Sequence, residues 1–325
     1  MSENNSITNR LDYGVEADSR CVAEAANEPA VSIDKPLPAI CCETGRILNA
    51  MTVDVEDYFQ VSAFEPYIPR ASWSGFEYRV EANVDRILEL FDRYSVKGTF
   101  FTLGWVAENF PEMTRRIADQ GHEMASHGSE HVMVTKQTRD QFLVDVSSSR
   151  DILEQVTGQR VLGFRAPSYS INKTNLWAHD VLREAGYTYS SSIAPIKHDL
   201  YGMPDAPRFA HLRSDGSVLE VPITTVRIGE RNVPCGGGGW FRLYPYSISR
   251  WAINKVNVVD GEAGVFYFHP WEIDPEQPRQ KQVNRKTQFR HYVNLGPTYG
   301  KIENLLKDFA WDRMDNIFNP ENHLS

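Results

Sequence analysis

From Ile47 onward, strand-like segments alternate with helix-like segments, and this order constrains the fold more than any other feature of the chain. Residues 48–55 have the pattern of a strand, and residues 99–103 are rich in β-branched and aromatic side chains, as strands are. Between them, residues 84–91 place apolar side chains at the i, i+3, i+4 and i+7 positions of an amphipathic helix. Such an alternation indicates a parallel sheet covered by helices.

The length of the patterned region suits one large domain. The chain has 325 residues, of which 41% are apolar, so it can bury a sizeable core. Residues 1–46 show no sustained period and predict a disordered tail. Residues 47–325 predict a single α/β domain, an irregular or closed (β/α) barrel with a C-terminal extension. An open doubly wound sheet is the alternative, although no GxGxxG motif follows the first strand.

Charge and hydropathy exclude several classes of partner. The chain has 34 basic and 43 acidic residues, a net charge of -9, and no basic run, so nucleic acid is not an expected partner. No stretch approaches the roughly 18 apolar residues of a membrane span. The first residues lack the basic and apolar regions of a secretory signal. We therefore expect a cytoplasmic protein, either free or peripheral at the inner face of the membrane.

Two motifs at predicted strand ends combine carboxylates and histidines. In a (β/α) barrel, functional side chains gather where the parallel strands end. The first strand runs into Asp54, Glu56 and Asp57, and three carboxylates at a strand end are costly unless they bind something. His127 and His131 are four residues apart and could reach one metal ion, since zinc favours histidine nitrogen and carboxylate oxygen. Each motif alone could equally be a solvated surface turn.

Two further motifs place single polar side chains after apolar strands. Arg165 directly follows such a strand, so it would be partly buried and would need a carboxylate partner. His269 ends the apolar run 265–268 and is followed by Pro270, a suitable place for a general acid or base. A structural ion pair and a packed histidine are the alternatives. Together, the four motifs predict one site.

The order of these motifs resembles the NodB-homology polysaccharide deacetylases, carbohydrate esterase family 4, over about residues 48–275. Within the family, residues 52–59, 164–170 and 236–242 look most like the branch found beside exosortase and exopolysaccharide genes, near PuuE and DVDxE-type peptidoglycan deacetylases. The resemblance implies an irregular (β/α) barrel of the NodB-homology type. It also implies a hydrolase that removes N-acetyl groups from a polysaccharide or oligosaccharide, with an exopolysaccharide precursor as the expected substrate.

The resemblance also implies the proton-transfer residues. Asp54 matches the catalytic base, Arg165 matches the arginine that orients it, and Pro167 matches the accompanying proline. His269 matches the late catalytic histidine, which protonates the departing amine. The aspartate that usually follows this histidine is replaced by Pro270, so the sequence does not identify the partner of His269.

One divalent metal ion, with zinc expected, is implied as the cofactor. His127 and His131 match the HxxxH metal pair of the family. The aspartate that supplies the third ligand is displaced here, because Val55 occupies the position after Asp54. Either Glu56 or Asp57 must take this role, and the sequence does not decide between them.

An N-acetylated saccharide is the expected partner, and the side chains expected to bind it are Pro167, Ser168, Tyr169, Trp240 and Trp271. Aromatic faces pack well on sugar rings, although core packing explains such residues equally well. The run of glycines at 236–239 allows either a close approach of backbone or a mobile lid.

Two other functions remain open. One is a small cyclic-amide hydrolase of the allantoinase-like type. The other is a non-catalytic relative that binds sugar, against which the complete set of carboxylate, histidine and arginine motifs argues.

Overall fold

The structure is a computed structural model that describes residues 39–43, 45–198, 201–212 and 218–318. The predicted tail therefore lies mostly outside the described residues, and its disorder stays a prediction. The structure describes residues 39–43 and 45–46, which precede Ile47, where the predicted domain begins. Cys41 and Ile47 form an antiparallel bridge, and the amide of Cys42 donates to the carbonyl of Arg46 at 2.8 Å.

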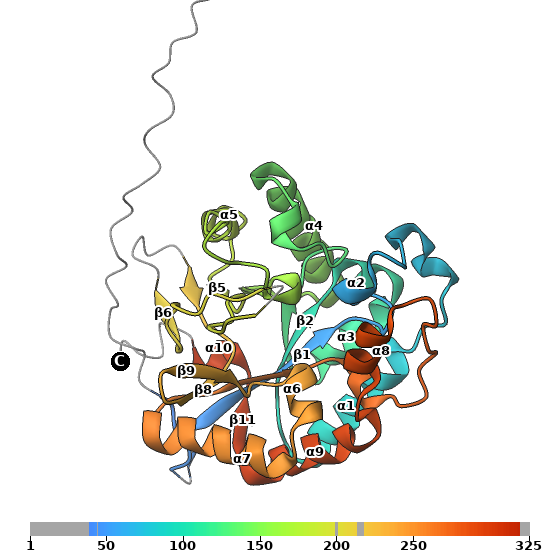
Figure 1. The fold of residues 1–325 in the computed structure, drawn as a ribbon. Helices are drawn as coiled ribbons and strands as arrows, with labels where there is room; N and C mark the ends of the chain where they lie inside the picture. The colour runs from blue at the N-terminus through green and yellow to red at the C-terminus, as the bar shows by residue number, and fades with distance from the viewer. Residues whose placement is uncertain (1–38, 44, 199–200, 213–217, 319–325) are drawn as a thin grey trace, which may run out of the picture. The chain divides into compact units, whose positions relative to one another are not determined.

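One nine-stranded sheet organises the described residues (Figure 1). Its strands are β1 (Leu48–Val55), β2 (Thr99–Thr102), β3 (Glu123–Ser126), β4 (Gly163–Phe164), β5 (Tyr189–Ser190), β6 (His211–Leu212), β7 (Leu219–Glu220), β10 (Val265–Phe268) and β11 (Ala310–Asp312). Their order is β10-β1-β2-β3-β4-β5-β7-β6, with β11 also paired to β1. Every pair is parallel except β6 with β7. A separate antiparallel hairpin consists of β8 (Thr225–Ile228) and β9 (Arg231–Pro234).

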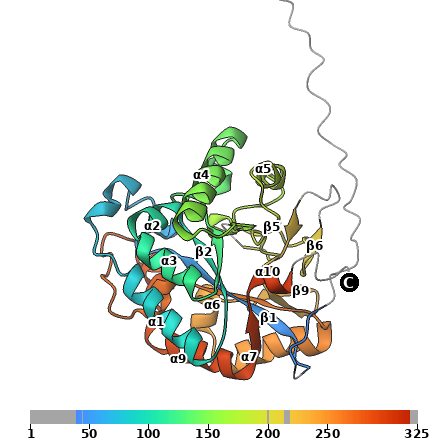
Figure 2. The ribbon, with the colours of Figure 1, turned by 180° about the vertical axis from the view of Figure 1, so that it is seen from behind.

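Helices connect the strands and cover the outer face of the sheet (Figures 1 and 2). The α-helices are α1 (Val80–Arg93), α2 (Gly104–Asn109), α3 (Pro111–Asp119), α4 (Arg139–Thr157), α5 (Ala178–Glu184), α6 (Gly238–Leu243), α7 (Tyr246–Lys255), α8 (Arg285–Tyr292), α9 (Leu295–Asp308) and α10 (Met314–Ile317). Short 3-10 helices are η1 (Ser62–Phe64), η2 (Arg70–Gly75), η3 (Val134–Lys136), η4 (Pro167–Tyr169) and η6 (Pro270–Ile273), and η5 (Val256–Asp260) is a π-helix. Within the described ranges, no helix combines the length and apolar character needed to cross a bilayer.

The strand order confirms the irregular (β/α) barrel and not the doubly wound alternative. From β1 to β5 the spatial order follows the chain order, and β10 returns to the free edge of β1. A doubly wound sheet would instead reverse its order at a switch point. The end strands β6 and β10 do not pair within the described part of the chain, so the barrel is open on one side.

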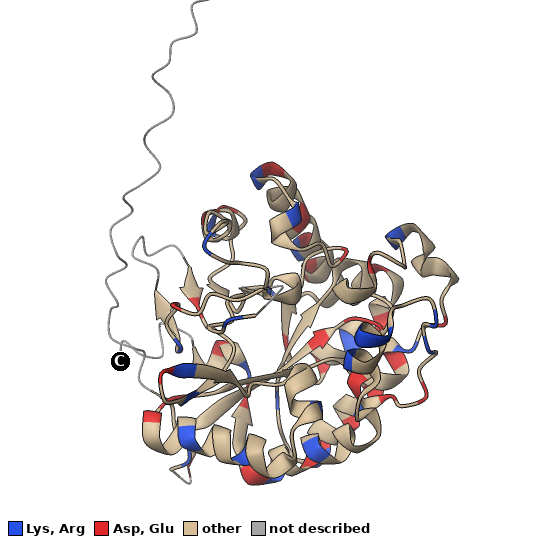
Figure 3. Ribbon diagram, in the orientation of Figure 1, with Lys and Arg blue, Asp and Glu red and all other residues tan. Residues whose placement is uncertain are grey.

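Each strand of the barrel separates an outer apolar core from an inner face. In β1, Met51 and Val53 pack in the large apolar cluster that includes the side chains of α1, α3 and α4. Because side chains alternate along a strand, Thr52 and Asp54 point to the opposite, inner face. Acidic and basic side chains are interspersed over the helices (Figure 3). Arg116 of α3, for example, pairs with two carboxylates of α1 at 2.9 Å.

A buried carboxylate lies at the first residue of β3. Glu123 accepts hydrogen bonds from the hydroxyl groups of Thr99 and Tyr189 at 2.5 and 2.7 Å and from the amide of Asp315 at 3.1 Å. Burial and the nearby Asp315 carboxylate raise the pKa of Glu123 from 4.5 to about 8. The folded protein therefore binds a proton here that the unfolded chain releases at lower pH.

We predict that this proton makes the fold less stable as pH rises. Between pH 4.5 and about pH 8 the folded state holds more protons than the unfolded state. Its free energy of unfolding should then fall with a slope of up to about 1.4 kcal/mol per pH unit from this group. Glu123→Gln removes the titration and keeps the shape. Urea unfolding at pH 5 and pH 8 should show a smaller pH dependence for the variant, and equal slopes would contradict the prediction.

Candidate functional site

The carboxyl ends of four parallel strands bring the predicted polar residues to one edge of the barrel. Asp54 lies near the end of β1, His127 follows β3, Arg165 follows β4 and His269 follows β10. Asp54, His127 and Arg165 are buried, and His269 is half-buried, with 17% of its side chain exposed. The residues that the sequence placed at separate strand ends therefore meet in one site.

Glu56, His127 and His131 form a group that could hold a metal ion. Each offers one ligand atom, and these atoms lie within 4.8 Å of one another. The Nε2 atom of His131 is 2.9 Å from Oε2 of Glu56. The loop after β3 reaches this geometry through Gly128 and His131, which both have positive φ, at 77° and 55°. Positive φ is rare for a residue other than glycine, so the surrounding contacts must hold His131 in place.

Outer hydrogen bonds orient both imidazoles of this group. Nδ1 of His127 lies 2.8 Å from the carbonyl oxygen of Arg165, and Nδ1 of His131 lies 3.3 Å from Oγ of Ser62. Ser168 in turn donates to Ser62 at 2.8 Å. Partners of this kind on one ring nitrogen leave the other nitrogen free to bind a metal. No sequence pattern pointed to Ser62, which is the first residue of η1.

The electrostatics of the group suit a cation. Burial opposes the charge of Glu56, but His131, His269 and His127 together hold the pKa of its carboxyl far below the usual range. Burial lowers the pKa of His127 to about 4. An ionised carboxylate and a neutral imidazole are the forms that bind divalent metals, so Glu56 and His127 fit such an ion.

Asp57, the other carboxylate considered as a ligand, lies in a different environment. Its side chain accepts hydrogen bonds from the backbone amides of Tyr58, Arg79 and Val80 at 2.8, 2.7 and 3.0 Å. Two of these amides open α1, where carboxylates commonly satisfy free N–H groups. The geometry therefore groups Glu56, and not Asp57, with the two histidines.

Asp54 and Arg165 form a buried ion pair. Nη1 of Arg165 donates to Oδ1 of Asp54 at 2.6 Å and to the hydroxyl of Thr52 at 2.7 Å. Its other nitrogens bond to the carbonyl and hydroxyl of Ser191 at 3.3 and 3.0 Å. The guanidinium also lies 4.0 Å from the centre of the Phe101 ring. With this many partners, the arginine can fix the Asp54 carboxylate in one position.

His269 faces both carboxylates of β1 and its loop. Its Nε2 atom lies 3.9 Å from Oδ2 of Asp54 and 3.6 Å from Oε1 of Glu56. Burial favours the neutral ring, but Glu272 first and then Glu56 and Asp54 raise the pKa of His269 to about 9. Trp271 stacks on the ring with a centroid distance of 5.0 Å, and its Nε1 donates to Glu56 at 3.1 Å.

The residues expected to bind substrate have different placements. Pro167, Ser168 and Tyr169 form η4 beside Arg165, and the last two have positive φ, at 56° and 51°. The Tyr169 hydroxyl is buried without a hydrogen-bond partner among the described residues. Trp240, on α6, instead stacks on Tyr244 with a centroid distance of 5.6 Å.

The glycine run at residues 236–239, which leads into α6, lies close to the backbone of β10. Gly237 pairs with Tyr267 of β10 in a parallel bridge, and the amide of Tyr267 donates to the carbonyl of Gly236 at 2.7 Å. A Cβ atom on Gly237 would clash with the carbonyl oxygen of Tyr267. The glycines therefore serve close backbone approach, one of the two expectations for this run.

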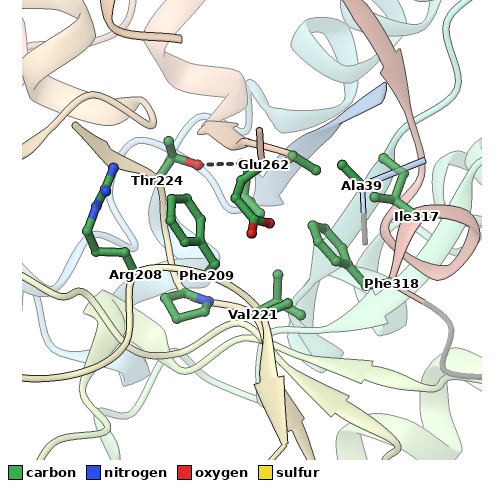
Figure 4. Close-up of a pocket in the computed structure, with 12 residues that line it drawn as sticks. Ala39, Arg208, Phe209, Val221, Thr224, Glu262, Ile317 and Phe318 are labelled. Carbon is green, nitrogen blue, oxygen red and sulfur yellow. Dashed lines mark hydrogen bonds between the residues drawn. The ribbon is translucent and has the colours of Figure 1, made fainter. Parts of the chain in front are cut away.

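A pocket at the opposite end of β10 shares no residue with this site. It is lined by Val265, the first residue of β10, together with Thr224 and Glu262 (Figure 4). The amino-terminal face of a barrel contributes mainly to stability, so we assign the chemistry to the carboxyl edge.

A (β/α) barrel with a buried acid–arginine pair and a metal-type ligand group at its carboxyl edge has the features of a barrel enzyme. Residues 68–190 match the family model for polysaccharide deacetylase, and residues 191–319 match a domain of unknown function, DUF3473. Residues 68–190 are therefore similar to polysaccharide deacetylases, the family that the sequence motifs resemble.

Part of the chain is also similar to individual proteins of known description. The chain is 32% identical over 118 residues to a peptidoglycan deacetylase of Helicobacter pylori, covering 35% of this chain and 38% of the relative. It is 33% identical over 94 residues to a peptidoglycan-N-acetylglucosamine deacetylase of Bacillus cereus, covering 29% of this chain and 34% of the relative. It thus spans little more than a third of each relative.

Structural comparison extends the likeness to most of the fold. A crystal structure from Mycobacterium smegmatis, assigned to the polysaccharide deacetylases, superposes with a TM-score of 0.56 at 20% identity. The match covers 88% of this chain and 93% of that chain. At this identity, the match supports the fold alone.

Proposed function

We propose that the protein is a metal-dependent N-deacetylase that releases acetate from an N-acetylated polysaccharide or oligosaccharide. The observation that carries the proposal is the meeting of Asp54, the Glu56–His127–His131 group and His269 at one edge of the barrel. This arrangement offers a base, a metal site and an acid within reach of one substrate amide. An exopolysaccharide precursor is the proposed substrate, on the resemblance of residues 52–59, 164–170 and 236–242 to the corresponding branch of the family.

Glu56, His127 and His131 would hold one divalent ion, for which we propose zinc. When bound, such an ion supplies Lewis-acid polarisation of the acetyl carbonyl and lowers the pKa of a nearby water. The fit rests on the donor set, because the outer partners of both imidazoles leave their Nε2 atoms free.

The protein's own residues would move two protons during amide hydrolysis. Asp54, held by Arg165, takes a proton from the attacking water as its oxygen bonds to the acetyl carbon. His269 gives a proton to the sugar nitrogen as the carbon–nitrogen bond breaks. The immediate products are acetic acid and a free amine, which become acetate and an ammonium ion in water. Asp54 then loses the proton it accepted and His269 regains one, which restores both groups.

Substrate binding is proposed for the residues around this edge. The amide of Tyr169 already donates to the carbonyl of Ala166 at 3.0 Å, so the amide of Ser168 is our candidate for stabilising the oxyanion. The Tyr169 hydroxyl would contact the sugar, together with Pro167 and the edge of the Trp271 ring, whose two faces stack on His269 and His291. Trp240 would bind a more distant sugar unit, since its ring stacks on Tyr244.

An acetate-release assay tests the function. The panel should hold chitin oligomers, peptidoglycan fragments and acetylated exopolysaccharide oligomers, with allantoin for the cyclic-amide alternative. We expect acetate from at least one saccharide, loss of activity with a chelator, and recovery with zinc. Hydrolysis of allantoin alone would favour the cyclic-amide hydrolase. Saccharide binding without any hydrolysis would favour the non-catalytic relative.

We predict that His127→Ala abolishes metal binding. The variant removes one of three proposed ligands from a buried site, where no other described side chain belongs to the group. Elemental analysis of the purified protein should give about one zinc per chain for the wild type and almost none for the variant. Asp57→Asn is the matched control, because this carboxylate bonds to backbone amides instead. Full metal content in His127→Ala would contradict the proposed site.

A further inference from the structure

A carboxylate that the family motifs do not provide contacts the proposed acid. Glu272 lies three residues after His269, in η6, and is 1% exposed. Its Oε2 atom is 3.4 Å from Nδ1 of His269 and accepts a hydrogen bond from the amide of His269 at 3.2 Å. Glu272 therefore faces the ring nitrogen that points away from Asp54 and Glu56.

A buried arginine from another element holds this carboxylate. Arg242, in α6, is 3% exposed, and its Nε donates to Oε1 of Glu272 at 2.8 Å. Its terminal nitrogens donate to the carbonyls of Arg290, His291 and Val293 at 3.0, 2.6 and 3.0 Å. These carbonyls lie at the end of α8, where a cation is favoured. The guanidinium of Arg242 is thereby held by Glu272 on one side and by the carbonyls at the end of α8 on the other.

Backbone pairing fixes the start of α6, the helix that carries Arg242. Gly237, directly before α6, pairs with Tyr267 of β10 and has no room for a side chain. β10, the strand directly before His269, thus also positions α6, the helix that carries Arg242. Stacked rings complete the support, because Trp271 lies between His269 and His291 with interplanar angles of 18° to each.

We infer that Glu272 and Arg242 are a positioning pair for the proposed acid, which hold the His269 imidazole in one orientation with Nδ1–H toward Glu272. Nε2 then faces the substrate side and carries the proton that is transferred. All three residues lie in 191–319, the region that matches a domain of unknown function. Its role in this chain is to supply and support the acid half of the site. The inference rests on the proposed deacetylase function.

Burying charged side chains such as these costs desolvation free energy, which only well-placed partners offset. Replacing a buried ion pair by apolar residues often leaves a protein equally stable, so a pair of this type is weak support for a purely stabilising role. The position of Glu272 between Arg242 and His269 is explained if its carboxylate orients the imidazole.

Kinetics of Glu272→Gln and Arg242→Lys test the inference. Each should keep the metal content and KM and lower kcat by about 10-fold or more, as expected when a general acid is misaligned. The deficit should shrink on amides with better leaving groups, which need less protonation. In the His269→Ala background, Glu272→Gln should cost less than about 2-fold, because coupled residues are not additive. Asp260→Asn, which weakens a partly exposed ion pair with Arg208 away from the site, is the control and should leave kcat unchanged.

The outcomes distinguish a failure of the proposed deacetylase function from a failure of the positioning pair. A wild-type protein that hydrolyses no saccharide overturns the proposed function. An active wild type whose Glu272→Gln variant matches Asp260→Asn overturns the positioning pair. The positioning pair is also overturned if the loss of kcat in Glu272→Gln is equal for all leaving groups. The same holds if Glu272→Gln lowers kcat by the same factor in the His269→Ala background as in the wild type. If Arg242→Lys does not fold, Glu272→Gln alone decides, because it keeps the shape of the side chain.

Discussion

Replacing Asp54 with asparagine is expected to lower turnover by roughly 10²- to 10⁴-fold, the usual contribution of a general base. The change removes the proton acceptor but leaves Glu56, His127 and His131 in place, so the metal content should stay at the wild-type value. Acetate release and elemental analysis on the same preparation measure both quantities.

The fold of this variant needs its own check. Arg165 would remain buried without its charged partner, which typically costs several kcal/mol of stability. Thermal unfolding should therefore show a lower Tm, and rates should be compared at a temperature where both proteins are folded. Turnover close to the wild-type value, or loss of the metal together with activity, would contradict the assignment of Asp54 as the base.

His269→Ala should lose most of its activity on sugar amides and much less on activated ones. A general acid contributes roughly 10²- to 10⁴-fold when the leaving group is a poor one, such as an alkyl amine. An anilide with an electron-withdrawing group departs with less need for a proton. We therefore expect the deficit of the variant to fall by at least about 10-fold from a chitin oligomer to 4-nitroacetanilide.

The metal content serves as the control for this experiment. His269 lies 3.6 Å from Glu56 but is not one of the three grouped ligands, so zinc should be retained. An equal deficit on both substrates would show that His269 does not protonate the leaving group. Loss of zinc would instead place it among the ligands.

Much of the fold and the arrangement of the site follow from short sequence patterns. The alternation of helix and strand periods predicts the barrel, because each period fixes which face of an element is buried. Parallel strands place their carboxyl ends at one edge, so residues after separate strands could be expected to meet there. Asp54, His127, Arg165 and His269 do so.

Residues within one loop were harder to predict. Glu56 and Asp57 are adjacent carboxylates, and the turn after β1 decides which of them points toward the histidines. That turn is fixed by contacts from distant segments, including the amides that open α1 and hold Asp57. A sequence pattern carries no information about such contacts.

The positioning pair was missed for a related reason. Arg242 and Glu272 are 30 residues apart, and their pairing depends on how α6 docks against β10. The Glu272 spacing three residues after His269 is the one local signal that could have indicated this carboxylate.

The register of β1 against β10 bears on how the proposed deacetylase could acquire new substrates. Val53 is aligned with Phe268, so Asp54 and His269 are the next residues on two neighbouring parallel strands. The backbone hydrogen bonds of the sheet therefore set the spacing between the proposed base and acid. The loop that contains η1 and η2 takes no part in this spacing. Its residues other than those that contact His131, such as Ser62, can therefore diverge toward new glycans while the two proposed proton-transfer groups keep their separation.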